Sequence, residues 1–288
     1  MIGTPATQTH AAVEAALRLH SPQLERIAAG RWHLSPSDGA NGAAQARLEE
    51  GWLTLKLCLP DHDLTLWDAL CLNREMQGLG KIVVSHDACT FEAAADIALT
   101  GLSDGALEQR LAEALADIAH AALRGAGRPS VSAGENAAER PAVDVAALVR
   151  ESGWPMTIRP SGAAAVRLDV PGEFCQALVE HERRTAAVRL KADLGEAADL
   201  SAASREATAL LMLTTSAVTR LARAYADRDA QGAPVGFEVA FSPPATPTEM
   251  GHALAALSVA SRMCRRELAV VRDESVARDY LAVHGRGV

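Results

Sequence analysis

Two stretches of the chain share one residue pattern. Ser152–Pro171 reads SGWPMTIRPSGAAAVRLDVP, and Gly30–Gly51 reads GRWHLSPSDGANGAAQARLEEG. Both stretches have a tryptophan near the start, alternating residues, a Pro/Ser/Gly turn, an alanine step and then Arg-Leu with an acidic residue. Alternation on both sides of a turn predicts a half-buried β-hairpin. Two such hairpins in one chain indicate an internal duplication.

The pattern of the first half predicts helices at both ends and a block of strands between them. The expected elements are a helix over Thr9–Leu19, a short helical turn from Ser21-Pro22 to Ile27, β-structure over Trp32–Leu59, a helix over Leu64–Met76, strands over Lys81–His86 and Thr90–Leu99, and a helix over Asp104–Leu123. The Gly-, Ser- and Pro-rich stretch Gly125–Pro141 then predicts a linker.

The second half repeats this order more loosely. The expected elements are a helix over Val143–Arg150, strands around the turn Pro160–Gly162, strands over Cys175–Glu180 and Thr185–Lys191, a long helix over Ala203–Asp229, a strand over Val235–Phe241, a helix from the capping box at Thr246–Glu249, and a last segment over Val276–Val283. Strands and helices come in blocks, which is typical of an α+β fold with antiparallel sheets. We therefore expect two tandem domains, residues 1–126 and 142–288, joined by a linker at 127–141.

Composition narrows the class of protein. The chain has 288 residues, 49% of them hydrophobic, and a net charge of −8. The residues before Ala126 include 16 acidic and 9 basic side chains, so most of the negative charge lies in the first half. An acidic surface argues against nucleic acid as a partner and fits a protein that binds an unfolded or basic polypeptide. The N-terminus lacks the pattern of a signal peptide, and no apolar run approaches the roughly 20 residues that span a bilayer.

These features predict a cytoplasmic protein that does not bind membranes, and the cysteines agree with that prediction. They are scattered, odd in number and set among apolar neighbours, which predicts reduced and buried thiols. They are Cys58, Cys71, Cys89, Cys175 and Cys264.

Candidate chemical sites are few. Asp61-His62-Asp63 is the strongest candidate for metal or acid–base chemistry, but no further Cys or His lies at ligand spacing, and a polar loop that caps the next helix is the better interpretation. His181–Arg184 is better explained as a solvated bend than as an anion site, and Gly78–Gly80 as a helix stop. Thr214–Ser216 either bonds back to the preceding turn or allows close approach of a helix from the other half, and we favour the second. The sequence thus predicts no catalytic residue, no metal and no cofactor, which favours binding over catalysis.

The segment Leu64–Leu123 carries a family resemblance. It reads LTLWDALCLNREMQGLGKIVVSHDACTFEAAADIALTGLSDGALEQRLAEALADIAHAAL, with a helix that ends near an Asn, a Gly-x-Gly, two strands and a helix. This order resembles the class I type III secretion chaperones over Thr9–Leu123, and the second half resembles them more loosely. The chain is also similar to the related YbjN-type fold.

The resemblance implies a non-enzymatic protein that binds a secreted effector or another component of the type III apparatus. Family members are homodimers that bind extended segments through hydrophobic grooves and strand addition. A tandem implies a pseudo-dimer within one chain, compatible with a monomer in solution, in which Leu64–Met76 faces Ala203–Asp229. The residues expected to bind the partner are Val13, Leu17, Trp52, Leu53 and Leu55.

Alternatives remain open at this point. Each of the five partner-binding residues could equally be ordinary core. The protein could be a regulator or scaffold that kept the chaperone fold without delivering cargo. A weaker alternative is an enzyme of unrecognised type that uses Asp61, His62 and His86.

Overall fold

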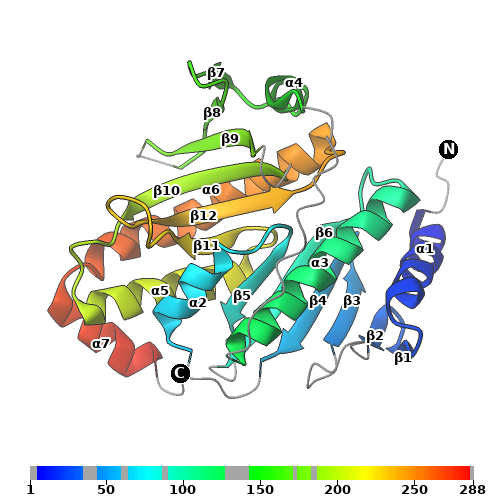
Figure 1. The fold of residues 1–288 in the computed structure, drawn as a ribbon, viewed down its shortest axis with the longest axis horizontal. Coiled ribbons are helices and arrows are strands. Elements are labelled where there is room, and N and C mark those ends of the chain that lie inside the picture. The colour runs from blue at the N-terminus through cyan, green and yellow to red at the C-terminus, as the bar shows by residue number, and fades with distance from the viewer. Residues whose placement is uncertain are drawn as a thin grey trace.

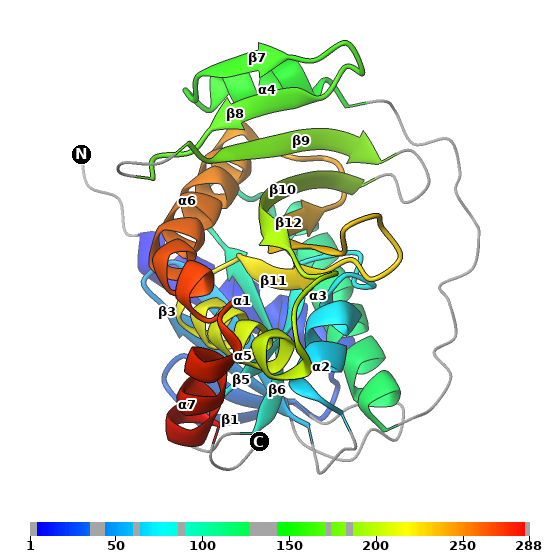
Figure 2. The same ribbon diagram turned by 90° about the vertical axis from the view of Figure 1, so that its left-hand side faces the viewer.

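The structure is a computed structural model that describes residues 5–34, 44–59, 64–85, 90–126, 143–170, 174–182 and 187–285. In these residues the chain forms two six-stranded antiparallel sheets and seven helices, shown in two orientations in Figures 1 and 2. The expected α+β class is confirmed. Among the described helices, none has both the length and the apolar content needed to cross a bilayer.

The first half runs from a helix through four strands to a second helix, and then through two strands to a third helix. Its elements are α1 (Pro5–His20), β1 (Glu25–Ala28), β2 (Arg31–Leu34), β3 (Ala44–Glu49), β4 (Trp52–Cys58), α2 (Leu66–Asn73), β5 (Gly80–Val84), β6 (Phe91–Ala98) and α3 (Asp104–Gly125).

The second half has the same sequence of elements with one further helix at its end. These elements are α4 (Val145–Glu151), β7 (Met156–Ile158), β8 (Ala164–Arg167), β9 (Gln176–Glu182), β10 (Ala187–Glu196), α5 (Ala202–Val218), β11 (Arg223–Ala226), β12 (Pro234–Phe241), α6 (Pro247–Val270) and α7 (Glu274–His284).

The two sheets have the same strand order. The first sheet is ordered β1-β2-β3-β4-β6-β5, and the second, read from its outer edge, is ordered β7-β8-β9-β10-β12-β11. Position by position, β1 corresponds to β7, β4 to β10 and β5 to β11. Among the helices, α2 corresponds to α5 and α3 to α6. A match in both chain order and sheet order is what an internal duplication produces.

Local sequence explains the hairpin between β3 and β4. Glu50 and Gly51 both have positive φ, 50° and 79°, and they lie between the paired residues Glu49 and Trp52. A two-residue loop with two positive φ angles matches the twist of the flanking strands. From Trp52 onward β4 alternates, with Leu53, Leu55 and Leu57 buried and Lys56 exposed. The expected half-buried strand is therefore present.

Two of the expected elements are wrong. The stretch Ser21–Ile27 does not form a helical turn, because β1 pairs with β2 over Glu25–Ala28. The long helix expected over Ala203–Asp229 ends at Val218, and β11 follows within the same range. Leu221, with a positive φ of 63°, lies in the turn between helix and strand. This correction makes the second half match the first more closely than its sequence indicated.

The halves meet through corresponding elements. Helix α2 packs against β11, α5 packs against β5, and the two helices also contact each other. Figure 1 shows these four elements in the middle of the molecule, where the inner edges of the two sheets meet. The facing of these two helices follows the expectation, although α5 is shorter than the sequence suggested.

Candidate functional site

The residues expected to bind a partner lie mostly in the core of the first half. Val13 and Leu17 on α1, and Leu53 and Leu55 on β4, are each 0% exposed. Trp52 is half-buried at the start of β4. In this conformation the four aliphatic side chains present no surface to another molecule, so the structure places them as ordinary core, the alternative that the sequence left open.

Trp52 contacts the other half of the chain. The guanidinium carbon of Arg220 lies 5.0 Å from the centre of its ring, within range of a cation–π contact. The ring of His252, on α6, lies 5.6 Å away on centroids. This tryptophan therefore joins the first sheet to the second half.

A buried arginine of the second half reaches into the first half. Arg223, on β11, is 1% exposed. Its guanidinium donates hydrogen bonds to three backbone carbonyls in the loop between α2 and β5: Met76 at 3.1 Å, Gly78 at 3.0 Å and Gly80 at 2.7 Å. It also donates two hydrogen bonds, of 2.8 and 3.1 Å, to Glu238 on β12. One side chain thus ties together elements about 145 residues apart in the chain.

Glu238 is the centre of this charge cluster. Besides Arg223, it accepts a 2.8 Å hydrogen bond from Arg189, and Arg74 of the first half lies 3.6 Å away. Complete burial by itself would raise the pKa of Glu238, but the neighbouring arginines outweigh it and hold the pKa below its ordinary value. The carboxylate therefore stays ionised, and its charge is compensated by cations from both halves.

A lysine of the first half makes the reciprocal contact. Lys81, on β5, donates to the backbone carbonyls of Ser216 at 2.9 Å and Thr219 at 2.7 Å, at the end of α5. It also pairs with Asp96 on β6 at 2.9 Å. Burial by itself would raise the pKa of Asp96, but Lys81 together with hydrogen bonds from Thr54 and the backbone of Leu221 outweighs it and holds the pKa below its ordinary value. Each half therefore sends one buried cation from its inner edge strand into the helix–strand loop of the other.

The structure shows which interpretation of Thr214–Ser216, at the end of α5, is right. The hydroxyls of Thr214 and Thr215 bond back to carbonyls one turn earlier, which is the interpretation that we did not favour. The carbonyl of Ser216 nonetheless accepts from Lys81, so the same short segment also lies at the contact between the halves.

The Gly78–Gly80 loop is held from both sides. The carboxylate of Asp117, on α3, accepts backbone hydrogen bonds from Gln77, Gly78 and Gly80 at 2.9 to 3.1 Å. A Cβ on Gly80 would lie 2.2 Å from the Cβ of Asp117, so only glycine fits there. The loop is more than the helix stop that its sequence indicates, because its N–H groups face a carboxylate and its carbonyls face Arg223.

A second buried arginine joins α3 of the first half to α6 of the second half. Arg110, on α3, is 1% exposed and bonds to Glu249 of α6 at 2.8 Å and to the carbonyl of Pro244 at 2.8 Å. Glu249 is also the capping-box residue that accepts from the backbone of Thr246 at 2.9 Å. The capping box expected from the sequence is confirmed, and its glutamate has this additional role.

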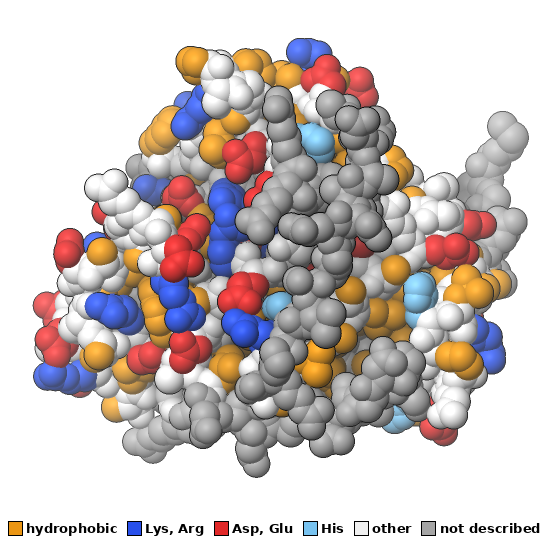
Figure 3. Space-filling model, viewed as in Figure 1, with side chains coloured by type: hydrophobic (Ala, Val, Ile, Leu, Met, Phe, Trp, Pro, Cys, Tyr) orange, Lys and Arg blue, Asp and Glu red, His pale blue; other side chains and the backbone are white. Residues whose placement is uncertain are grey.

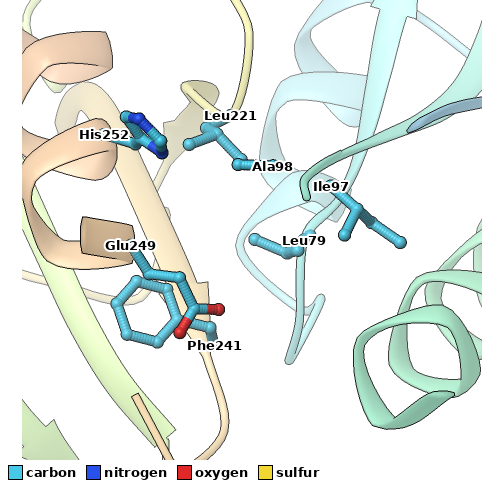
Figure 4. Close-up of a pocket in the computed structure, with 7 residues that line it drawn as sticks. All are labelled: Leu79, Ile97, Ala98, Leu221, Phe241, Glu249 and His252. Carbon is cyan, nitrogen blue, oxygen red and sulfur yellow. The ribbon is translucent and has the colours of Figure 1, made fainter. Parts of the chain in front are cut away.

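One small pocket lies between the halves (Figure 4). It encloses about 280 Å³, a volume that includes space open to solvent, and is lined by Leu79, Ile97, Ala98, Leu221, Phe241, Glu249 and His252. The lining is mainly apolar, and the Glu249 carboxylate already bonds to Arg110. The pocket is best described as a gap in the packing between the halves.

The outer edge strands are the more open parts of the two sheets. All four residues of β1 are exposed, and β7 is half-buried to exposed. Each edge strand has one large exposed apolar side chain, Ile27 on β1 and Ile158 on β7, both 52% exposed. Leu19, near the end of α1, and Phe174, just before β9, are 66% and 67% exposed. Exposed strand edges with apolar neighbours are sites at which another chain can pair.

Charged side chains of both signs gather on one part of the face seen in Figure 1. Figure 3 shows Lys/Arg and Asp/Glu side chains next to one another where α2 meets the second half. Arg74 pairs there with Asp227 at 3.4 Å, and Arg228 with Asp68 at 3.5 Å.

The sequence candidates for chemistry add no site. Asp61, His62, Asp63 and His86 lie outside the described residues. Within the described ranges, no group of three or more His, Cys, Asp or Glu side chains is placed to hold a metal ion.

The described cysteines are free thiols. Cys58 is exposed, contrary to the expectation, whereas Cys71, Cys175 and Cys264 are buried. Burial raises the pKa of Cys264 to about 12, so this thiol is not activated as a nucleophile.

Comparison with models of protein families, with curated proteins and with solved structures finds no match to this chain.

Proposed function

We propose that this chain is a non-catalytic binding protein of a type III secretion system, a tandem chaperone-like pseudo-dimer that binds an effector or an apparatus protein in the cytoplasm. The observation that carries the proposal is the repeated topology. Each half has the order helix, strands, helix, two strands, helix, which is the order that resembles the chaperone family, and the two halves pack through corresponding elements.

The outer edges supply the binding surfaces in this proposal. An extended partner segment pairs with β1 or β7, and main-chain hydrogen bonds give affinity without strict sequence requirements. Ile27 on β1, together with Leu19 near the end of the preceding helix, contacts the partner at the first edge, and Ile158 on β7 does so at the second. These exposed residues replace the buried set expected from the sequence as candidates for contact with the partner.

Co-purification with the full chain, followed by mass spectrometry, tests the proposal. We expect a secreted protein or an apparatus component to be recovered. A Leu19→Asp/Ile27→Asp double variant should lose it if the first edge binds, and Ile158→Asp should lose it if the second edge binds, because a charge opposes strand addition. The proposal is wrong if no such protein is recovered, or if its recovery is unchanged by all of these substitutions.

A second candidate function is that of a regulator or scaffold with the same fold. It is favoured by the burial of Val13, Leu17, Leu53 and Leu55, which leaves the α1–β4 region without the apolar surface that the sequence suggested. This function predicts one stable, non-secreted partner in the same co-purification experiment.

A further inference from the structure

The outer face of α6 differs in character from that of its counterpart in the first half. Both α3 and α6 follow the last strand of their half, and each packs on its own sheet, α3 mainly on β5 and β6 and α6 on β10 and β12. The exposed residues of α3 before its last turn are small or acidic: Asp104, Gly105, Glu108, Ala112, Ala116 and Ala119. The exposed Arg124 in the last turn pairs with Glu75 at 3.2 Å. This is an ordinary solvated face, and it serves as an internal reference for α6.

The solvent side of α6 combines large apolar residues with arginines. Its exposed residues include Val259, Met263 and Val270, which are 38%, 46% and 55% exposed. Arg262 and Arg266 are exposed between them. Because residues three, four and seven apart share a helix face, these five form one stripe, about 17 Å long at 1.5 Å per residue. Figure 2 shows α6 on the outside of the molecule.

The arginines of this stripe form no ion pair. Neither the Arg262 nor the Arg266 side chain has an ion-pair or hydrogen-bond partner among the described residues. The acidic residues of the helix are Glu249, which is bonded to Arg110, and Glu267, which is exposed next to Arg266, so two arginines and one glutamate lie on this surface. A positive, apolar stripe is therefore present on a chain whose net charge is −8.

From these observations we infer that the α6 stripe is a docking surface for an amphipathic helix of a partner protein that has both acidic and apolar residues. The apolar side chains gain by leaving water, and the arginines keep favourable partners on burial only if the partner supplies carboxylates. Helices that dock in this way place residues three or four apart along the groove or face that they bind.

Two other occupants fit the stripe less well. A second copy of this chain could offer the acidic face of α3, but that face has no large side chain to cover Met263 and the valines. A lipid surface is usually bound by helices that offer a broad face with Trp, Phe or Leu. In α6 the leucines, Leu254, Leu257 and Leu268, are buried in the core.

This surface is a helix face of the second half and not a sheet edge, so the inference does not rest on the proposed function. Fluorescence anisotropy with the full chain tests it. The probe is a labelled synthetic helix of about 16 residues, long enough to run along the stripe, with Leu on one side and Glu beside it. A second peptide with Lys in place of Glu is the reference probe.

We expect the acidic peptide to bind, more weakly as salt is added, and the Lys peptide not to bind. Arg262→Gln/Arg266→Gln and Val259→Ser/Met263→Ser should each weaken binding by roughly tenfold or more. The control is Ala112→Glu/Ala116→Glu on α3, which makes the same change in net charge as the arginine variant. It should leave binding unchanged.

Three results would overturn the inference. The first is that the acidic peptide does not bind, or that it binds equally well to the arginine variant and to the α3 control, since either outcome means that the two arginines do not contribute to binding. The second is binding to phosphatidylserine vesicles, but not to the peptide, that depends on the two arginines. The third is self-association, measured by light scattering, that is lost in the arginine variant, because it would identify a second copy as the occupant.

Discussion

Replacing Arg223 with methionine tests whether the buried charges hold the two halves together. Methionine keeps much of the volume of the side chain but has no hydrogen-bond donors. The substitution removes the hydrogen bonds to the carbonyls of Met76, Gly78 and Gly80, and it removes one of the cations that neutralise Glu238.

The expected loss follows from those contacts. Removing one partner of a buried ion pair costs about 3–5 kcal/mol, because the other charge remains buried. Here Glu238 keeps its 2.8 Å contact with Arg189, which reduces that cost. The carbonyls left without a donor add to it, at about 1–3 kcal/mol for each buried group that water does not reach. With three such carbonyls, we expect the free energy of unfolding to fall by at least about 3 kcal/mol, a large part of the total for a typical domain.

Urea unfolding of the full chain, followed by circular dichroism, measures this loss. The matched control is Arg228→Met, since Arg228 also pairs across the halves, with Asp68, but the two side chains are 54% and 46% exposed. Exposed pairs contribute about 0–1 kcal/mol, so the control should unfold close to wild type. If Arg223→Met loses no more stability than Arg228→Met, the reasoning about the buried contact is refuted.

Three further predictions concern the core and the loop. Gly80→Ala should destabilise the protein by more than about 2 kcal/mol, because its Cβ would meet Asp117, whereas Gly105→Ala has open space around it and should cost nothing measurable; thermal melts compare them. Leu53→Ala should cost about 2–5 kcal/mol in urea unfolding, and a cost under about 1 kcal/mol would contradict its place in the core. The ion pairs of Glu238, whose folded pKa is lowered, stabilise the fold fully above its ordinary value of 4.5 and are lost as pH falls through the folded pKa. The stability difference between wild type and Glu238→Gln should therefore shrink in urea titrations run progressively below pH 4.5, and a difference that grows there would contradict the assignment.

Elements with a strong local signal could be predicted from the sequence. The regular apolar spacing of α3 and the Thr246–Glu249 capping box of α6 act within one or two helical turns, and both appear where expected. The alternation after Trp52 likewise predicted β4 and which of its side chains share a face. The matching strand orders bear out the duplication, but the two hairpins that suggested it are not equivalent. Gly30–Gly51 contains β2 and β3, whereas Ser152–Pro171 contains β7 and β8, the counterparts of β1 and β2.

Elements whose conformation depends on distant partners could not be predicted. The segment Arg223–Ala226 consists largely of good helix formers, and it becomes a strand because it pairs with β12 and packs against the other half. The burial of individual side chains could not be predicted either, for the same reason. Alternation shows which side chains share a face, but only the packed structure shows which face is covered, and so Leu53 and Leu55 proved to be core.

The amino-acid sequence by itself determined the class of fold, the duplication and most of the helices, since these depend on periodicity and on residues close together in the chain. Only the tertiary structure decided how the halves are joined. The cations Lys81 and Arg223 bond to carbonyls 135 to 147 residues away, and no local pattern encodes such a pairing. It depends on two loops meeting in space, and only the packing of the two halves against each other brings those loops together.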